Sequence, residues 1–277
     1  MTSPIYNTET AKLIGQLADS QPQALLLEGM SGVGLATIAR HLAWRDLAGF
    51  IQPTDREGSV DTSGKGVIRI PQIRELIEQS RGKFTTRQVF IIDDADKMNH
   101  QAQNAFLKLL EEPAPNIHFI LTAHTPHQLL ATILSRVQRI RIRPVSNEDS
   151  KRLISKLGVT DSRKVQQLLF LANGRPAEIA RLASNEKLFA ERATLMTDAR
   201  ELIQGRPYSK ALVVSRYYND RAKTLQLLEL AQTIITFTLA SAPSKELVDM
   251  VDRLATTYER IAANGNVRLQ LMNFVVH

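Results

Sequence analysis

The chain has 277 residues, enough for one large domain or for two to three smaller ones, each with its own hydrophobic core. Hydrophobic residues make up 43% and charged residues 23%, and no apolar run reaches the length of a membrane span. Cysteine is absent, which excludes disulfides and thiolate metal sites. The 35 basic and 28 acidic side chains give a net charge of +7, which favours polyanionic partners without identifying nucleic acid as one. The amino terminus, MTSPIYNTETAK, does not look like a signal peptide, so we expect a cytoplasmic protein without a membrane partner.

Short apolar runs alternate with amphipathic helical patterns in the first half of the chain, an order typical of a parallel sheet with crossover helices. Four runs are predicted to be strands, at residues 24–28, 89–92, 117–122 and 139–143. The last run, RIRIR, alternates strictly and should bury Ile140 and Ile142 while its three arginines face solvent.

Two helices between these strands have recognisable start signals. Asn99 is a candidate N-cap for a helix that ends before Pro113. The apolar residues of this helix share one face: Ala102, Ala105, Phe106, Leu109 and Leu110. Thr125, followed by proline and then by Gln128, is typical of an N-cap with a capping box. Residues 52–66 are rich in Gly, Ser, Thr, Asp and Pro and are expected to form a surface excursion.

Strand patterns end at Pro144, and the remaining sequence is predicted to be helical, with glycine or proline breaks. The sequence therefore predicts an α/β fold with a parallel sheet in residues 1–144, followed by a small helical domain in residues 145–184. An all-helical domain is expected in residues 185–277.

The stretch GMSGVGLATIAR, residues 29–40, has the glycine frame of a phosphate-binding loop without its two reactive side chains. In the motif G-x-x-x-x-G-K-[ST], backbone amides face the phosphates, the lysine reaches them and the hydroxyl holds magnesium. Here leucine replaces the lysine and alanine replaces the hydroxyl residue; the positions concerned are Gly29, Gly32, Gly34, Leu35 and Ala36. A glycine turn after a strand can also serve steric needs alone.

A second candidate element is the pair Asp93 and Asp94, which follows an apolar run. In phosphoryl-transfer enzymes such acids hold magnesium and orient water. Without the lysine and the hydroxyl there is little cation to organise here, so we expect a helix-capping acidic turn with no catalytic role in this chain.

A third element is the pair Ser135 and Arg136, between a predicted helix and the RIRIR run. Such an arginine is either a solvated cation at a helix terminus or an arginine finger offered to a neighbouring subunit's nucleotide.

Together these segments resemble the AAA+ clamp-loader proteins, and most closely the delta-prime subunits of bacterial DNA polymerase III. The matching segments are residues 70–76, IIDDADKMN at 91–99, 103–113, 119–122 and LLATILSRVQ at 129–138, with a weaker match at 266–272. The resemblance implies a RecA-like AAA+ domain with a degenerate phosphate loop in residues 1–144, a helical lid in 145–184 and a helical collar in 185–277.

The resemblance also implies roles for particular residues. Ser135 and Arg136 align with the family's Ser-Arg-Cys motif, whose arginine completes the ATP site of the adjacent motor subunit, although Val137 replaces the cysteine. Many relatives carry a four-cysteine zinc module where this chain has residues 44–66, and its absence here rejects zinc. Ala177 stands where motor subunits have a sensor arginine.

The expected function is that of a non-hydrolysing delta-prime-like subunit that supplies an arginine finger in trans. It should bind no cofactor firmly, with ATP-Mg at the neighbouring subunit. Its expected partners are the motor and delta subunits and, indirectly, the sliding clamp and primer-template DNA. The alternatives are an ATP-hydrolysing motor subunit in which Thr37 serves magnesium, and a DNA-binding AAA+ module that uses Arg139, Arg141 and Arg143.

The carboxyl-terminal helices offer a set of apolar residues that either contact other subunits or form the core of their own domain. They are Leu225, Leu228, Ile235, Leu247, Val251, Leu254 and Ile261.

Overall fold

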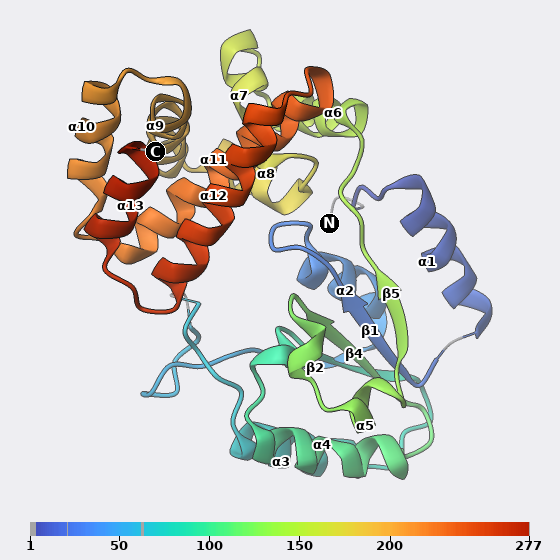
Figure 1. The fold of residues 1–277 in the computed structure, drawn as a ribbon. Helices are drawn as coiled ribbons and strands as arrows, with labels where there is room; N and C mark the ends of the chain where they lie inside the picture. Colours follow the sequence, from blue (N-terminus) through green and yellow to red (C-terminus); the bar gives the residue numbers. More distant parts are fainter. Residues whose placement is uncertain (1–3, 21, 62–63, 277) are drawn as a thin grey trace. The chain divides into compact units, whose positions relative to one another are not determined.

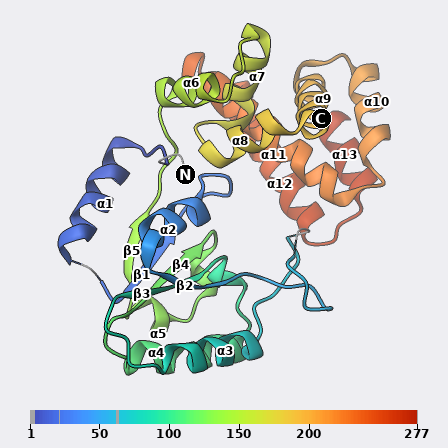
Figure 2. The ribbon, with the colours of Figure 1, turned by 180° about the vertical axis from the view of Figure 1, so that it is seen from behind.

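The computed structural model describes residues 4–20, 22–61 and 64–276. The chain divides into two compact units, Met1–Ser184 and Asn185–His277, which Figure 1 shows from one side and Figure 2 from behind. No helix within the described ranges has the length and apolar character that a membrane crossing requires.

The first unit is built on a parallel sheet with the strand order β2-β3-β4-β1-β5, whose strands are labelled in Figure 2. Its strands are β1 (Ala24–Glu28), β2 (Leu47–Ile51), β3 (Gln88–Ile92), β4 (Ile117–Ala123) and β5 (Gln138–Arg141). The four predicted strands are confirmed. The prediction missed the edge strand β2, because its sequence LAGFI includes alanine and glycine, which strands disfavour.

Helices cover both faces of this sheet, as the continuous apolar strands require. Leu25 and Leu27 in β1 point to a core shared with α1 (Thr8–Ser20) and α2 (Leu35–Ala43). Leu26 points the other way. Its core also contains side chains of α3 (Ile70–Ser80), α4 (His100–Glu111) and α5 (Ala131–Leu134).

Helix α4 begins as the sequence predicts, because the Asn99 side chain accepts a hydrogen bond from the Ala102 amide at 2.8 Å. Phe106 is fully buried and meets Phe119 of β4 edge-on, with ring centroids 5.4 Å apart. Ala105, Leu109 and Leu110 are only partly buried at the margin of this core, so Phe106 rather than Leu109 is the main packing residue of the helix.

Pro126 takes the first helical position as predicted, but the capping box predicted at Thr125 is wrong. Its side chain caps nothing, and residues Pro126–Gln128 form only a single 3-10 turn. The backbone is extended at Leu129 and Leu130, and α5 starts three residues after the turn ends. The capping-box pattern failed because this segment is held by tertiary hydrogen bonds rather than by a local cap.

Beyond Pro144 the described residues form helices only, as expected. The first unit ends with α6 (Asn147–Lys156), α7 (Ser162–Ala172) and α8 (Pro176–Ser184). The second unit consists of α9 (Glu186–Gln204), α10 (Pro207–Tyr217), α11 (Arg221–Ser241), α12 (Lys245–Ala262) and α13 (Val267–Val276). The further division at Pro144 into a sheet domain and a lid stays a prediction.

The second unit has a core of its own. Four of the seven apolar residues singled out above are fully buried in it, and three are partly buried. Asp198, also buried, accepts a hydrogen bond of 2.7 Å from the Tyr217 hydroxyl and pairs with Arg216. Burial and the neighbouring carboxylate raise the pKa of Tyr217 far above its ordinary value, so this phenol stays protonated and joins α9 to α10.

Candidate functional site

The glycine loop lies at the carboxyl end of β1, where the chain turns from strand to helix. Gly32 and Gly34 have φ values of 87° and 95°, a region that residues with a Cβ rarely adopt, and Gly34 is the N-cap of α2. The loop thus keeps the backbone shape expected from its glycines.

The side chains at the two replaced positions are not free in solvent. Leu35 is only 3% exposed and packs in the core with Val33 and Ile38. Ala36 is partly buried, and Thr37 is exposed one residue later on α2. The loop therefore carries neither an ammonium nor a hydroxyl at the two positions that need them.

Helix α8 packs against this loop within the same unit. The Glu178 amide donates to the Gly32 carbonyl at 3.1 Å, and the Arg175 guanidinium donates to the Ser31 carbonyl at 3.3 Å. A Cβ added to Gly32 would lie 3.0 Å from the Cβ of Glu178. The glycine loop is therefore held by hydrogen bonds and packing from Arg175 and Glu178 of the same unit.

Asp93 and Asp94 follow β3 at the same edge of the sheet and are bound by Thr122 of β4. The Thr122 hydroxyl donates to Asp93 Oδ1 at 2.6 Å and accepts from the Asp94 amide at 2.9 Å. Burial raises the pKa of Asp93 above its ordinary value, with the nearby Asp94 charge adding to the rise and the Thr122 hydrogen bond opposing it.

Groups of the chain itself face the Asp94 carboxylate. Lys97 Nζ lies 2.8 Å from Asp94 Oδ2, and His124 Nε2 lies 3.4 Å from Asp94 Oδ1. The other ring nitrogen of His124 lies 2.8 Å from the Gly29 carbonyl oxygen, so the imidazole joins the acidic turn to the glycine loop. The Asp94 carboxylate is therefore already bound by side chains of its own chain.

A buried glutamine connects this edge to the segment that leads to Arg136. Gln103 of α4 donates to the carbonyl oxygens of Met98 and Gln128, both at 3.1 Å, and accepts from the Leu130 amide at 2.7 Å. Its side chain therefore joins the turn at Met98 to the segment of Gln128 and Leu130, at a position that is 5% exposed.

Arg136 lies at the amino ends of the strands, whereas the glycine loop lies at their carboxyl ends. It follows α5 and precedes β5, whose first residue, Gln138, pairs with Leu25 near the start of β1. Gly29 follows four residues beyond Leu25, which corresponds to about 13 Å along the sheet at roughly 3.3 Å per residue. Arg136 is thus remote from the loop of its own chain.

The side chain of Arg136 is 38% exposed. Its Nη1 donates to the Thr132 carbonyl at 3.1 Å and to the Ser135 hydroxyl at 3.4 Å, while its Nη2 lies 3.1 Å from the Glu111 carboxylate. Val137 packs against the α3–α4 core instead of facing solvent with the arginine.

The strand arginines behave as the alternation predicts, with Ile140 and Ile142 buried. Arg139 binds Glu28 at 2.7 Å, and Arg143 binds Glu9 at 3.1 Å. Two of the three cations considered for DNA binding are therefore already paired within the chain.

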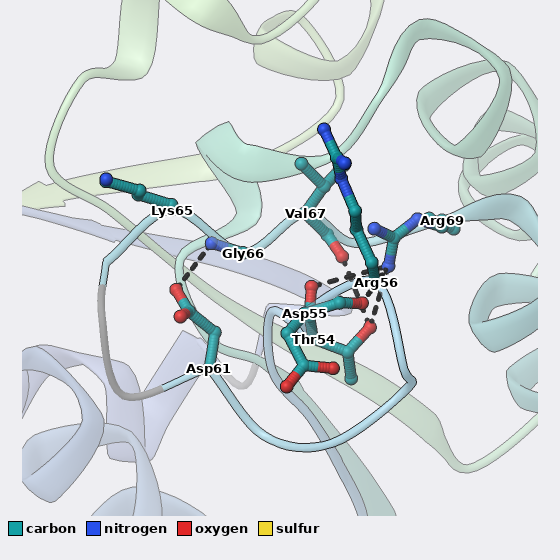
Figure 3. A pocket seen from close by; sticks show the side chains of 8 residues that line it. All are labelled: Thr54, Asp55, Arg56, Asp61, Lys65, Gly66, Val67 and Arg69. Atoms are coloured by element: carbon teal, nitrogen blue, oxygen red, sulfur yellow. Dashed lines mark hydrogen bonds between the residues drawn. The ribbon is translucent and has the colours of Figure 1, made fainter.

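A pocket of about 460 Å³ lies in the segment expected to form a surface excursion, and its lining mixes both signs of charge (Figure 3). Arg69 donates to Thr54 Oγ1 at 3.1 Å and to the Asp55 carbonyl at 2.8 Å. These bonds tie the excursion to the start of α3. Among the described residues, no group of three or more His, Cys, Asp or Glu side chains is arranged to hold a metal ion.

Sequence reasoning identified the loop, the two aspartates and the arginine, but missed their partners. Lys97, Thr122 and His124 lie near the ends of apolar runs, as functional polar residues often do. Gln103 had a clearer signal, because it is a polar residue next to Ala102 and three positions before the buried Phe106. Nothing in the sequence indicated Glu178, whose contact with the loop depends on distant folding.

Comparison with known proteins gives a consistent result. Residues 46–146 match the family described as "DNA polymerase III, delta subunit". DNA polymerase III subunit delta' of Pseudomonas aeruginosa is 31% identical over 140 residues, which cover 50% of this chain and 42% of that protein. Replication factor C subunit 3 of Saccharomyces cerevisiae is 28% identical over 166 residues, covering 54% and 46%. The aligned part of the chain thus spans less than half the length of these relatives.

A solved structure agrees in fold. A DNA polymerase III gamma subunit-related protein of Thermotoga maritima aligns with a TM-score of 0.54 and 20% identity, over 96% of this chain and 97% of that one. At this identity the match supports the α/β fold with its following helices, while the sequence matches carry the family resemblance.

Proposed function

Because the chain is similar to the delta-prime subunits of bacterial DNA polymerase III, we propose that this protein is a non-hydrolysing clamp-loader subunit. It belongs to a ring whose motor subunits bind ATP-Mg. The motor and delta subunits are its direct partners, and the sliding clamp and primer-template DNA are reached through the assembled ring. The subunit itself works in the cytoplasm of a bacterium and binds no nucleotide firmly.

The glycine loop supports the non-hydrolysing role. Leu35 is buried in the core, helix α8 packs on Gly32, and Lys97 neutralises Asp94. A loop without a lysine to reach the phosphates or a hydroxyl to hold magnesium lacks two groups on which phosphoryl transfer depends.

The observation that carries the proposal is the position of Arg136. It lies on a short segment between α5 and β5, partly exposed and at the edge of the sheet remote from its own loop. An arginine placed in this way is suited to a neighbour's nucleotide, where its planar fork stabilises the charge of the transferring phosphoryl group.

The experiment is the substitution Arg136→Ala in the ring reconstituted with the subunits that co-purify from the same cell. The finger is worth roughly 10³ to 10⁵ in rate at the site that it serves. The whole ring should lose the share of DNA-stimulated ATP turnover that passes through this site, together with clamp loading, while assembly is unchanged. Arg136→Lys should rescue poorly, because lysine offers a point charge in place of a planar fork. A fully active ring with Arg136→Ala would refute the role in trans.

The second candidate is a motor subunit of the same ring, in which Thr37 serves magnesium. Thr37 is exposed on α2, one residue after Ala36, so its hydroxyl is open to solvent. Tight ATP binding by the isolated protein, with turnover lost in Asp93→Asn, would favour this candidate. A DNA-binding module would instead show salt-dependent DNA affinity of the isolated protein, reduced by Arg141→Ala.

A further inference from the structure

Helix α4 contributes a charged partner to Arg136 at its last residue. Glu111 ends the helix and lies half-exposed, with its carboxylate 3.1 Å from Arg136 Nη2. The same helix is anchored by the Asn99 cap at its start and by the buried Phe106 one turn and a half before its end. Glu111 therefore projects from a fixed element, whereas Arg136 stands on a short connection.

The contacts of Arg136 restrain its direction without using up its donors. Nη1 is held by the Thr132 carbonyl and the Ser135 hydroxyl, and Nη2 by the Glu111 carboxylate. The guanidinium carries five N–H donors in a rigid plane. Fixing both terminal nitrogens orients this plane, and donors are left over for a phosphate oxygen.

We infer that Glu111 is a positioning residue that orients the Arg136 guanidinium toward the nucleotide of the neighbouring subunit. This inference rests on the proposed function, since it takes Arg136 to be the residue that reaches the phosphates. Glu111 itself touches no nucleotide. It acts by restricting the Arg136 side chain to fewer orientations in advance. Less conformational entropy is then lost when the neighbour binds ATP.

The opposite role for the same contact is that of a restraining counter-ion, which would withhold the arginine from its target. The two roles differ in what glutamine does at the position. Glutamine keeps an acceptor oxygen at the same reach and loses the charge, whereas alanine loses both. A positioning role predicts that glutamine preserves more activity than alanine, and a restraining role predicts that both changes raise activity.

The experiment measures DNA-stimulated ATP turnover of the reconstituted ring containing Glu111→Ala, Glu111→Gln or the control Glu112→Ala. Glu112 is the adjacent exposed glutamate, and its side chain lines the groove between α3 and α4. Glu111→Ala should lower kcat about two- to fivefold at unchanged KM, the ratio that corresponds to the coupling of a partly exposed ion pair. Glu111→Gln should fall between Glu111→Ala and the unmodified ring, and Glu112→Ala should match the unmodified ring.

The double variant separates a failure of this inference from a failure of the proposed function. If Glu111 acts through Arg136, the ring with both Glu111→Ala and Arg136→Ala has the turnover of the ring with Arg136→Ala alone. Unchanged or raised turnover with Glu111→Ala, beside a clear loss with Arg136→Ala, would overturn the positioning role and leave the proposed function standing. Full activity with Arg136→Ala would overturn the proposed function and this inference with it. Thermal melting of each purified variant checks that none of the losses comes from unfolding.

Discussion

The two edges of the parallel sheet use their charged groups in different ways. At the carboxyl edge, Asp94 faces Lys97 and His124, and the glycine loop beside them is bonded to α8. At the amino edge, Arg136 is held by an exposed ion pair and stays partly open to solvent.

This difference shows how a site that lacks its reactive groups is kept folded. Two adjacent carboxylates repel each other, and the chain places Lys97 Nζ 2.8 Å and His124 Nε2 3.4 Å from the Asp94 carboxylate. Exposed ion pairs contribute only up to about 1 kcal/mol. The carboxyl edge is thus closed by its own side chains and by α8, whereas the amino edge holds an oriented cation that still faces solvent.

The largest expected effect comes from putting the missing lysine back. Leu35→Lys should destabilise the first unit by roughly 3–5 kcal/mol, because leucine packing is lost and an ammonium enters the core. Thr37→Lys adds the same charge at an exposed position of the same helix and should change stability by less than about 0.5 kcal/mol. Urea unfolding measures both. A stable Leu35→Lys protein that binds ATP would contradict this difference between the two edges, since the glycine loop would then accept a lysine and a nucleotide.

A smaller effect is expected at Gln103, which ties the turn after β3 to the segment before α5. Gln103→Ala should cost about 2–4 kcal/mol, because the Leu130 amide and two carbonyl oxygens lose their partner in a buried place. Asn104→Ala, next to it but exposed, is the control and should stay within about 0.5 kcal/mol. Denaturant midpoints of the two variants provide the test. Equal midpoints would mean that the three hydrogen bonds of Gln103 do not contribute to the stability of the folded protein.

The smallest effect concerns the pH dependence of the acidic turn. The folded protein raises the pKa of Asp93, so between the unfolded and the folded pKa the folded state binds more protons than the unfolded state. The contribution of Asp93 to stability is therefore present below the unfolded pKa and is lost as the pH rises through the folded pKa. Asp93→Asn should gain stability relative to the unmodified protein as the pH is raised from the acidic range to neutrality. Parallel melting curves at several pH values measure this, and a constant difference would contradict it.

The sequence predicted most of the fold because the signals involved are local. The apolar runs of β1, β3, β4 and β5 and the Asn99 cap depend on neighbouring residues and were found. Strand β2 was missed because its alanine and glycine give a weak local signal, whereas its pairing with β3 is a contact between distant residues. The false cap at Thr125 has the same origin, since Gln103, 25 residues before Gln128, decides the local backbone.

The motif residues of the candidate site could be predicted from the sequence, but the side chains that bind them could not. A missing lysine can be seen in a motif, and so can the pair Ser135 and Arg136 before a strand. The contact of Glu178 with Gly32 joins residues that have no common pattern, and so does that of Glu111 with Arg136. Such pairs follow from tertiary packing, which a single sequence does not encode in any periodicity.

The strand order also determines when this sheet is completed during synthesis. Leu26 in β1 pairs with Leu121 in β4 and with Arg139 in β5, so the strand made first lies between the two made last. On the ribosome, β1 stays without either neighbour until the chain has been extended past β4, and its apolar residues are exposed for that time. Contacts so distant in sequence slow folding and leave intermediates open to aggregation. A nascent chain that has not yet emerged beyond β4 is therefore a natural substrate for chaperones that bind apolar segments.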